Sequence, residues 1–555
     1  MNKYLFALLS LSFFFLSNSN AVGQTQYAFK INFVDKKGTK GDLASPSTFL
    51  SAKSLARRTK QSLVPDSSDL PVSSIYTDSV LKVTEGIFHT KSRWQNNCVL
   101  LLYDSSKMNL VRSCSFVKSV QYVGIYLSPL HAMMALPEGE KKSLEKFPEL
   151  SKTTGTSAYY GDAYDQIKLA NGDYLHDRGF RGNGKLIAVI DEGFYLVNTL
   201  PGYDSLRFSG RIADTYNFNL DTDYVYAYSA HGTEVLSTMA GIMTGTYVGT
   251  APDASYALYV TENSGSEQPI EMDNLVAAME RADSAGADVI TISLGYNTFN
   301  IGTLNADLSL TDIDGKSTVA ARAANTATQK GILVVASAGN EGGTSWAKVL
   351  TPGDADSALT CGSVDINKLR SPTSGKGPNA AGVRKPDVCM LGAPGIVLNN
   401  SGTTSSVSGT SIATPQLAGL AACLWQANPS ATPYKLRKAI RESAHIASTP
   451  DDLLGFGVPD FGKADLSIDS VPDNVSAVTV MPNPFSDLIT IKLPQSNTID
   501  IQWIILNIQG QKLLSGSVSN KSRFNIPVPG NFPSGIYFLQ LVNGNTNSFS
   551  KIQKL

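Results

Sequence analysis

The central part of the chain alternates short apolar runs with helical patterns. From Lys185 onward, continuous apolar runs predict strands at 186–190, 256–260, 289–292 and 332–336. Between two of them, apolar side chains recur at a helical spacing over 272–279, and the alanine-rich stretch 319–327 also favours a helix. Apolar strands separated by helices are typical of a parallel sheet covered on both faces. We therefore expect an α/β domain here.

The two flanking regions follow other patterns. Before residue 150, β-type runs such as 27–34 and 98–103 lie between polar turns, with a candidate helix at 50–63. This pattern indicates a small α+β domain. After Leu466 the helical patterns stop, and short turn-bounded runs predict an antiparallel β-sandwich, with strands at 475–480, 488–493, 501–506 and 536–542.

These changes divide the 555 residues into four parts. Residues 1–23 are expected to be a secretory signal peptide, because Lys3 is followed by an apolar stretch to Leu16 and by small residues near Ala21. A retained membrane anchor is the weaker alternative, since a membrane span needs about 20 residues. The other parts are 24–150, 151–466 and 467–555, and the charged and then Ser/Thr/Gly-rich stretch 138–160 is typical of a linker where chains are cut.

Composition narrows the class of partner. A net charge of -1 and a charged fraction of 17% leave no basic stripe for nucleic acid or an anionic membrane, so ordinary polypeptide fits better. The five cysteines are too scattered for a disulfide framework. Cys98 and Cys114 are either a bridge or, as we expect, buried thiols. The cysteines form no CxxC pair and no cluster with histidine, which argues against a structural zinc.

Three segments carry candidate chemistry. Asp191 ends an apolar strand, and sites in parallel sheets form at the carboxyl ends of strands. His231 opens a segment of small and apolar residues, with Gly232 leaving space beside a side chain that is the usual general base. Ser411 precedes an apolar helix, with Pro415 expected in its first turn. Taken singly, each has a structural alternative: a capping Asp, a capping or core His, and a capping Ser.

A fourth segment argues against purely structural roles for these three residues. Asn340 follows an apolar strand and a glycine, where a side-chain amide could donate to a developing oxyanion. Alone it would be an ordinary Gly-Asn turn. Four such residues at the ends of elements of one predicted sheet favour a common catalytic role.

The segments 188–193, 231–235, 338–341 and 409–415 resemble the four signatures of the subtilisin-like serine peptidases, or subtilases. The resemblance covers about residues 159–466. It implies that Ser411 attacks the peptide carbonyl, that His231 transfers the proton, and that Asp191 orients the imidazole. It also implies an oxyanion hole made by Asn340 with the Ser411 N–H. The segment Ser293, Leu294 and Gly295 resembles the family's substrate-pairing strand.

The resemblance is incomplete at some positions. Glu192 stands where many family members have Ser or Thr, which leaves the surroundings of Asp191 open. No cofactor is required. A structural calcium ion would suit the family, but the acids at 312–315 and 221–223 lack a full ligand pattern, so no metal site is assigned. Glu341 is expected at the rim of the pocket for the side chain before the scissile bond, slightly favouring basic or long residues.

The flanking regions also resemble known parts. Residues 24–150 occupy the position of the inhibitory, folding-assisting pro-domain of subtilases. The C-terminal part is similar to the type A sorting domains of the type IX secretion system, through residues 481–485 and 534–537 and through Lys551 and Lys554. A carbohydrate- or protein-binding sandwich is the alternative.

The sequence therefore predicts a serine endopeptidase, made as a zymogen and exported through the periplasm to the cell surface or the medium. Its expected partners are polypeptide substrates, its own pro-domain and the type IX machinery, without nucleic acid or a stable membrane span. A catalytically silent binding protein or adhesin on the same fold is the alternative. An esterase of the α/β-hydrolase type is disfavoured, because Ser411 lacks the Gly-x-Ser-x-Gly elbow and the order Asp, His, Ser differs.

Overall fold

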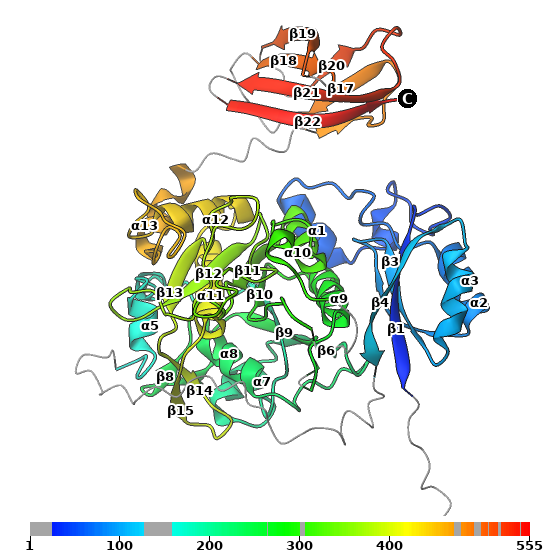
Figure 1. The fold of residues 1–555 in the computed structure, drawn as a ribbon. Coiled ribbons are helices and arrows are strands. Elements are labelled where there is room, and N and C mark those ends of the chain that lie inside the picture. The colour runs from blue at the N-terminus through cyan, green and yellow to red at the C-terminus, as the bar shows by residue number, and fades with distance from the viewer. Residues whose placement is uncertain are drawn as a thin grey trace, which may run out of the picture. The chain divides into compact units, whose positions relative to one another are not determined.

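The computed structural model describes nine stretches of the chain: 25–126, 158–263, 265–299, 306–470, 479–492, 501–508, 510–519, 523–543 and 546–555. The expected signal peptide, nearly all of the expected linker, and residues 475–478 of the first predicted sandwich strand lie outside them. The described residues form two compact units, one ending at Ile468 and one beginning at Asp469 (Figure 1).

A seven-stranded parallel sheet forms the centre of the first unit, in the order β13-β12-β11-β10-β5-β9-β6 (Figure 1). The strands are β5 (Leu186–Asp191), β6 (Ile212–Asn217), β9 (Ser255–Val260), β10 (Val289–Ile292), β11 (Leu333–Ser337), β12 (Leu359–Val364) and β13 (Val388–Leu391). The four predicted central strands are thus confirmed. β6 and β12 escaped prediction because small and polar residues interrupt their apolar pattern, and the short apolar run of β13 was not singled out.

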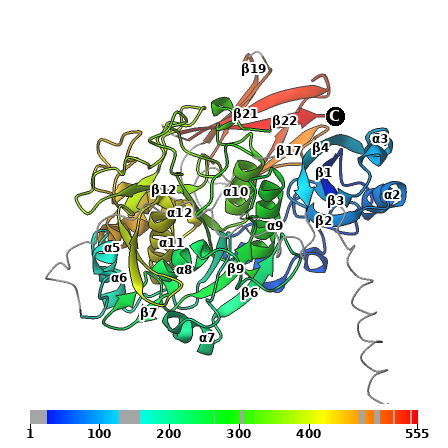
Figure 2. The same ribbon diagram turned by 60° about the horizontal axis from the view of Figure 1, so that its bottom comes forward.

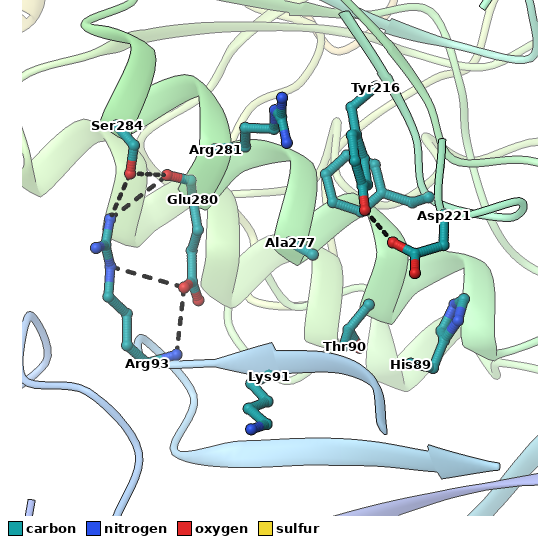
Figure 3. A pocket seen from close by; sticks show the side chains of 11 residues that line it. His89, Thr90, Lys91, Arg93, Tyr216, Asp221, Ala277, Glu280, Arg281 and Ser284 are labelled. Carbon is teal, nitrogen blue, oxygen red and sulfur yellow. Dashed lines mark hydrogen bonds and ion pairs between the residues drawn. The ribbon is translucent and has the colours of Figure 1, made fainter. Parts of the chain in front are cut away.

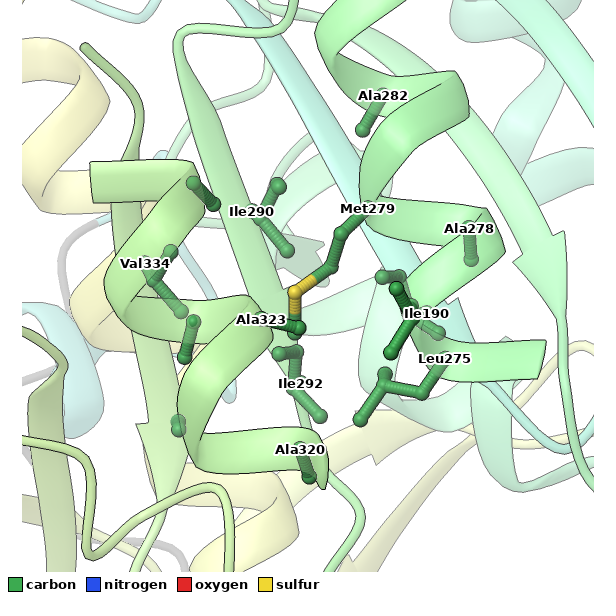
Figure 4. Packing of buried hydrophobic residues seen from close by; sticks show 14 of the residues in the cluster. Ile190, Leu275, Ala278, Met279, Ala282, Ile290, Ile292, Ala320, Ala323 and Val334 are labelled. Atoms are coloured by element: carbon green, nitrogen blue, oxygen red, sulfur yellow. The ribbon is translucent and has the colours of Figure 1, made fainter. Parts of the chain in front are cut away.

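Helices cover both faces of this sheet. α9 (Ile270–Ala285) and α10 (Val319–Gln329) pack on one face, where Met279 lies among Ile190, Ile290 and Ile292 (Figure 4). Alternate residues of the same strands face the other side, against α11 (Thr410–Ala427), which also packs against α8 (His231–Ala240). α11 is buried from Thr410 to Trp425, as expected for a helix at the centre of such a domain.

Shorter elements complete this domain. They are α5 (Tyr164–Lys168), α6 (Asp173–Asp177), η3 (Pro201–Tyr203), α7 (Asp204–Phe208), β7 (Ile242–Met243), β8 (Tyr247–Val248), η4 (Leu310–Asp312), β14 (Gly395–Leu398), β15 (Thr404–Val407), α12 (Pro433–Glu442), α13 (Phe461–Ser467) and η5 (Ile468–Ser470). Most of them lie around the sheet as connections between its main helices and strands.

The N-terminal α+β domain has an antiparallel sheet in the order β2-β3-β1-β4. Its elements are β1 (Gln26–Phe33), η1 (Pro46–Thr48), α1 (Ala52–Lys60), α2 (Ser74–Thr84), β2 (Ile87–Ser92), β3 (Asn97–Leu102), η2 (Ser105–Lys107), α3 (Met108–Arg112) and β4 (Val117–Tyr126). One face of this sheet packs on α2 and α3, and the other lies beside α9 in both views (Figures 1 and 2).

The second unit is the predicted antiparallel β-sandwich. One sheet has the order β16-β17-β20 and the other β19-β18-β21-β22. The strands are β16 (Thr479–Met481), β17 (Leu488–Lys492), β18 (Ile501–Leu506), β19 (Lys512–Val518), β20 (Arg523–Pro527), β21 (Gly535–Asn543) and β22 (Thr546–Lys554). A shared apolar core that includes Phe485, Ile505 and Leu539 lies between the sheets.

The cysteines and the apolar character of the helices can also be compared with the sequence analysis. All five cysteines are free, and all but Cys114 are buried, so the Cys98–Cys114 bridge does not form. Among the described residues, no helix has both the length and the apolar character that crossing a membrane requires.

Candidate active site

The candidate residues gather at the carboxyl edge of the sheet because three neighbouring strands end there in register. Ile292 of β10 pairs with Ile190 of β5 on one side and with Ala336 of β11 on the other. Asp191, Ser293 and the segment leading to Asn340 follow these positions directly. The edge is therefore where the predicted acid, substrate-pairing segment and amide donor meet.

Asp191 and His231 are in direct contact. Asp191 is fully buried, and its Oδ1 lies 2.6 Å from Nδ1 of His231 and accepts a 2.8 Å hydrogen bond from the N–H of Glu192. Its Oδ2 has no hydrogen-bond partner within the described chain. A buried carboxylate with so few donors depends on the imidazole, and a proton on Nδ1 leaves Nε2 able to accept one.

Gly232 makes this contact sterically feasible. A Cβ at Gly232 would lie 2.3 Å from the carbonyl oxygen of Gly193 and 3.0 Å from Cβ of Asp191. Any larger residue would therefore push the start of α8 away from the end of β5. The space expected beside the imidazole is occupied by the backbone and side chain of the Asp191 segment.

Glu192 joins the surroundings of His231 through Ser229. The Ser229 hydroxyl donates to Oε2 of Glu192 at 3.1 Å and accepts the N–H of His231 at 3.1 Å. Burial alone would lower the pKa of His231, but the carboxylates of Asp191, Glu192 and Glu234 raise it above its ordinary value. Glu192 therefore adds negative charge beside the base at the position where the sequence departs from the family pattern.

Ser411 lies in the first turn of α11, and Gly409 holds the N-cap position. The Ser411 hydroxyl is buried and has no hydrogen-bond partner among the described residues, so the alternative of a capping serine is wrong. No hydrogen bond is found for its N–H within the described chain either. No bond joins Ser411 to His231 in this structure, and such bonds are often long without substrate.

Pro415 does not lie in the first turn of α11, where the sequence analysis placed it. α11 begins at Thr410, so Pro415 lies in the second turn and removes the N–H that would bond the carbonyl of Ser411. The Ser293 hydroxyl donates to that carbonyl at 3.0 Å instead. The loop after β10 thus replaces the missing helix bond, and Ser293 supports the backbone of Ser411 in addition to its predicted place in the substrate segment.

Asn340 has a fixed orientation. Its Oδ1 accepts from the N–H of Thr410 at 2.9 Å and from the Thr410 hydroxyl at 3.0 Å. An amide held by its oxygen presents its NH₂ in the opposite direction, and no protein acceptor for that group is found within the described residues. Thr410 was not singled out from the sequence, although its position next to Ser411 was the available signal.

The segment Ser293, Leu294 and Gly295 runs beyond the end of β10. The carbonyl of Leu294 accepts from the Ser337 hydroxyl at 3.0 Å, and Tyr296 bonds the carbonyl of Thr351 at 3.0 Å. The N–H and carbonyl of Gly295 make no hydrogen bond with the described chain. Free backbone groups of this kind can pair with an extended peptide.

The structure describes one group of acids that could hold a metal ion: Glu262, Glu267 and Glu271, whose oxygens all lie within 4.8 Å of one another. Burial raises the pKa of Glu262 to about 8 and raises that of Glu271 as well. The sequence did not point to this group. The acids that it did consider have other partners: Asp221 bonds Tyr216, and Asp312 and Asp314 bond nearby serines.

Comparison with known families agrees with this geometry. The subtilase family matches residues 182–458, the Bacteroidota peptidase S8 propeptide domain matches 28–136, and a secretion system C-terminal sorting domain matches 479–554. Each match falls on one of the three folded parts described above. The sorting domain indicates that the protein is secreted.

Curated relatives match the catalytic part. A thermostable alkaline protease of Halalkalibacterium halodurans is 30% identical over 303 residues, which is 54% of this chain and 72% of that protein. Subtilisin DY of Bacillus licheniformis is 29% identical (50% and 90% covered), and subtilisin BL of Lederbergia lenta is 30% identical (51% and 91% covered). The chain belongs to the subtilase family of serine endopeptidases, with a propeptide and a C-terminal sorting domain.

We expect the Glu192→Gln variant to keep more of its activity at low pH. A neutral His231 is needed to accept a proton, so activity falls as the pH drops through its pKa. Removing the Glu192 charge removes one cause of the raised pKa of His231, which moves the acidic limb of kcat/KM to lower pH.

The measurement is kcat/KM on a short peptide between pH 5 and 10. Glu442→Gln, at an exposed position at the end of α12, removes the same charge away from the site and serves as the control. An acidic limb that is identical in all three proteins would show that Glu192 does not act on His231.

Proposed function

We propose that Asp191, His231 and Ser411 form the catalytic triad of this endopeptidase and that Asn340 supplies one donor of its oxyanion hole. The observation that carries the proposal is the 2.6 Å contact between His231 Nδ1 and Asp191 Oδ1. It fixes the tautomer that a general base needs, because the proton stays on Nδ1 and Nε2 is left to accept.

The first chemical step forms an acyl-enzyme. Ser411 Oγ attacks the peptide carbonyl while its proton passes to Nε2 of His231. The resulting imidazolium is stabilised by the Asp191 carboxylate and by the negative charge of Glu192 and Glu234. His231 then gives the proton to the amine of the leaving fragment, and the carbon–nitrogen bond breaks.

The second step reverses these roles with water. A water molecule gives a proton to Nε2 of His231 and attacks the ester carbon, after which the proton returns to Ser411 Oγ and the acid product leaves. Each attack puts negative charge on the former carbonyl oxygen. The NH₂ of Asn340 and the N–H of Ser411, at the positive end of α11, have no hydrogen-bond acceptor among the described residues and could donate to that oxygen.

Substrate would bind as an extended strand along the segment that ends at Gly295, whose backbone N–H and carbonyl make no hydrogen bond with the described chain. The carbonyl of Glu341 accepts hydrogen bonds from Thr344 and Ala347, but its side chain has no partner within the described residues, and it stays the predicted rim residue of the adjacent side-chain pocket. The relatives named subtilisin and alkaline protease support a polypeptide substrate.

We infer that the chain is synthesised as an inactive precursor and passes the periplasm before type IX export. The propeptide match and the sorting-domain match support these two steps. A catalytically silent adhesin is disfavoured, because all four candidate catalytic residues are present and Asp191 and His231 are in contact.

Ser411→Ala is expected to abolish cleavage of denatured protein, lowering turnover by about 10⁶-fold, because the nucleophile is lost while the fold remains. Processed enzyme and variant are compared on casein and on a peptide substrate. Ser401→Ala, at an exposed position, is the matched control. Unchanged cleavage by Ser411→Ala would rule out the proposed triad.

Asn340→Leu is expected to lower kcat by about 10²- to 10³-fold with little change in KM, because the lost donor acts mainly on the developing oxyanion. Asn367→Leu, in an exposed turn, controls for the substitution itself. A variant that loses only substrate affinity would show that Asn340 binds the ground state instead.

Deletion of residues 475–555 is expected to block release from a bacterium that has type IX secretion, leaving the protein in the periplasm. Cell fractions are compared by immunoblot, and a periplasmic carrier protein fused to 475–555 tests whether this part is sufficient. Normal release of the truncated chain would instead favour a binding role for the β-sandwich.

A further inference from the structure

The pro-domain helix α1 lies across the C-terminal ends of two helices of the catalytic domain. Ser51 at its N-cap donates to the carbonyl of Ser284 at 2.6 Å, and Gln61 at its end donates to the carbonyl of Gly331 at 2.7 Å. The helices end so close to α1 that a Cβ at Gly286 would lie 2.6 Å from Cβ of Lys53. This contact is separate from the active site.

Arg57 of α1 satisfies backbone groups that both helices leave open. It donates to the carbonyl of Lys330 at 3.1 Å, just beyond α10, and to that of Ala287 at 3.2 Å, just beyond α9. Carbonyls at a helix C-terminus lack partners within the helix and carry partial negative charge. A guanidinium at this position supplies both the donors and the opposite charge.

Asp283 concentrates the charge of this contact. It is fully buried near the end of α9, and its carboxylate accepts from Arg57, from Arg58 at 3.0 and 3.1 Å, and from Arg93 at 3.0 Å. Ser54 of α1 also donates to it at 2.9 Å. Three cations of the pro-domain thus surround one carboxylate of the catalytic domain, and they hold the pKa of Asp283 below its ordinary value in spite of burial.

The charge pattern is reciprocal. Lys330 of the catalytic domain inserts among pro-domain acids, 3.0 Å from Asp66 and 3.0 Å from Asp69, and Asp69 also accepts from Arg58 at 2.8 Å. The side chain of Asp69 is completely buried. Each domain therefore supplies cations that pair with buried carboxylates of the other.

Other parts of the interface are less tightly closed. Beside Arg93, a cavity of about 360 Å³ lies between β2 and α9, lined on the pro-domain side by His89 and Lys91 (Figure 3). Figure 3 shows Arg93 reaching across to Glu280 and Ser284 at the end of this cavity. Apolar packing between the domains involves Ile270 at the start of α9, which meets the sheet of the pro-domain, and Trp94, which packs into the core of the catalytic domain.

The two ends of α9 are well separated. Asp283 is 13 residues beyond Ile270, or about 20 Å at 1.5 Å per helical residue. The last strand of the pro-domain, β4, meets the catalytic domain near the start of α9, where the N–H of Ile125 bonds Gln268 at 2.6 Å. A cut in the linker that follows β4 would leave the contacts of Asp283 unchanged.

We propose that the C-terminal ends of α9 and α10, with Asp283, form a docking exosite for a dibasic helix, and that Arg57 and Arg58 at this exosite keep the pro-domain bound after the linker is cut. The inference rests on the proposed function only in taking linker cleavage as the activating event. Loss of Arg57 and Arg58 removes two of the three cations around the buried Asp283 and the Arg57 donors of the Lys330 and Ala287 carbonyls, so it accelerates dissociation.

The experiment uses the full chain carrying Ser411→Ala, with a recognition site for a foreign endoprotease placed within residues 138–157. After the linker is cut, the dissociation rate of the pro-domain is measured by size exclusion and by fluorescence of a labelled pro-domain. Arg57→Gln/Arg58→Gln is expected to accelerate dissociation about a hundredfold or more. Lys107→Gln/Arg112→Gln, whose partners lie within the pro-domain, is the matched control and is expected to change nothing.

Folding is checked before the cut by circular dichroism and thermal melting. If the double variant does not fold, Arg57→Gln alone is measured, since Arg58 then still bonds Asp69 and Asp283, and a smaller acceleration is expected. A dissociation rate within twofold of the unaltered complex would overturn the proposal. The outcome is independent of the triad, because the cut is made by another enzyme in an inactive chain.

Discussion

The in-register pairing of β5, β10 and β11 is the constraint on which the catalytic geometry depends. It brings the ends of three separate strands to one edge, so that Asp191, the loop from Ser293 and the turn with Asn340 are neighbours. A shift of one residue in a strand would turn alternate side chains to the opposite face of the sheet. Asp191 would then point away from α8, and the contact with His231 would be lost.

Helix α11 completes this arrangement through contacts that are not local in sequence. Pro415 leaves the carbonyl of Ser411 without its helical partner, and the Ser293 hydroxyl occupies that place. Thr410 holds the oxygen of Asn340 and so sets the direction of the amide. The nucleophile is therefore positioned by the loop after β10, and the predicted oxyanion donor by the first residue of α11.

The fold was predictable wherever a local pattern records it. The strands β5, β9, β10 and β11 are continuously apolar, and α9 and α11 carry clear helical patterns. The polar run of β6 and the small residues of β12 hide two further strands. The acid, the base, the nucleophile and the amide donor could be identified from their flanking glycines and strands. The support of Ser411 by Ser293 could not be identified, since the two are 118 residues apart in sequence. The same holds for the pro-domain contact between Arg57 and Asp283, which are 226 residues apart.

Burial of opposite charges also explains why the pro-domain interface is specific. A carboxylate such as Asp283 is costly to bury unless cations and donors surround it, and the pro-domain provides them from α1 and from the turn after β2. In the same way Lys30 is buried against Asp273 at 3.2 Å. A different domain with the same shape but other charges would leave these groups unpaired.

The position of the Asp283 contacts gives activation a concentration dependence. While the linker is intact, pro-domain and catalytic domain share one chain and meet at an effective concentration in the millimolar range. Once it is cut, the same contacts become an equilibrium between two molecules. If the proposed cut precedes release, the fraction of enzyme with a bound pro-domain falls as the secreted protein is diluted, so that dilution itself would favour the free enzyme.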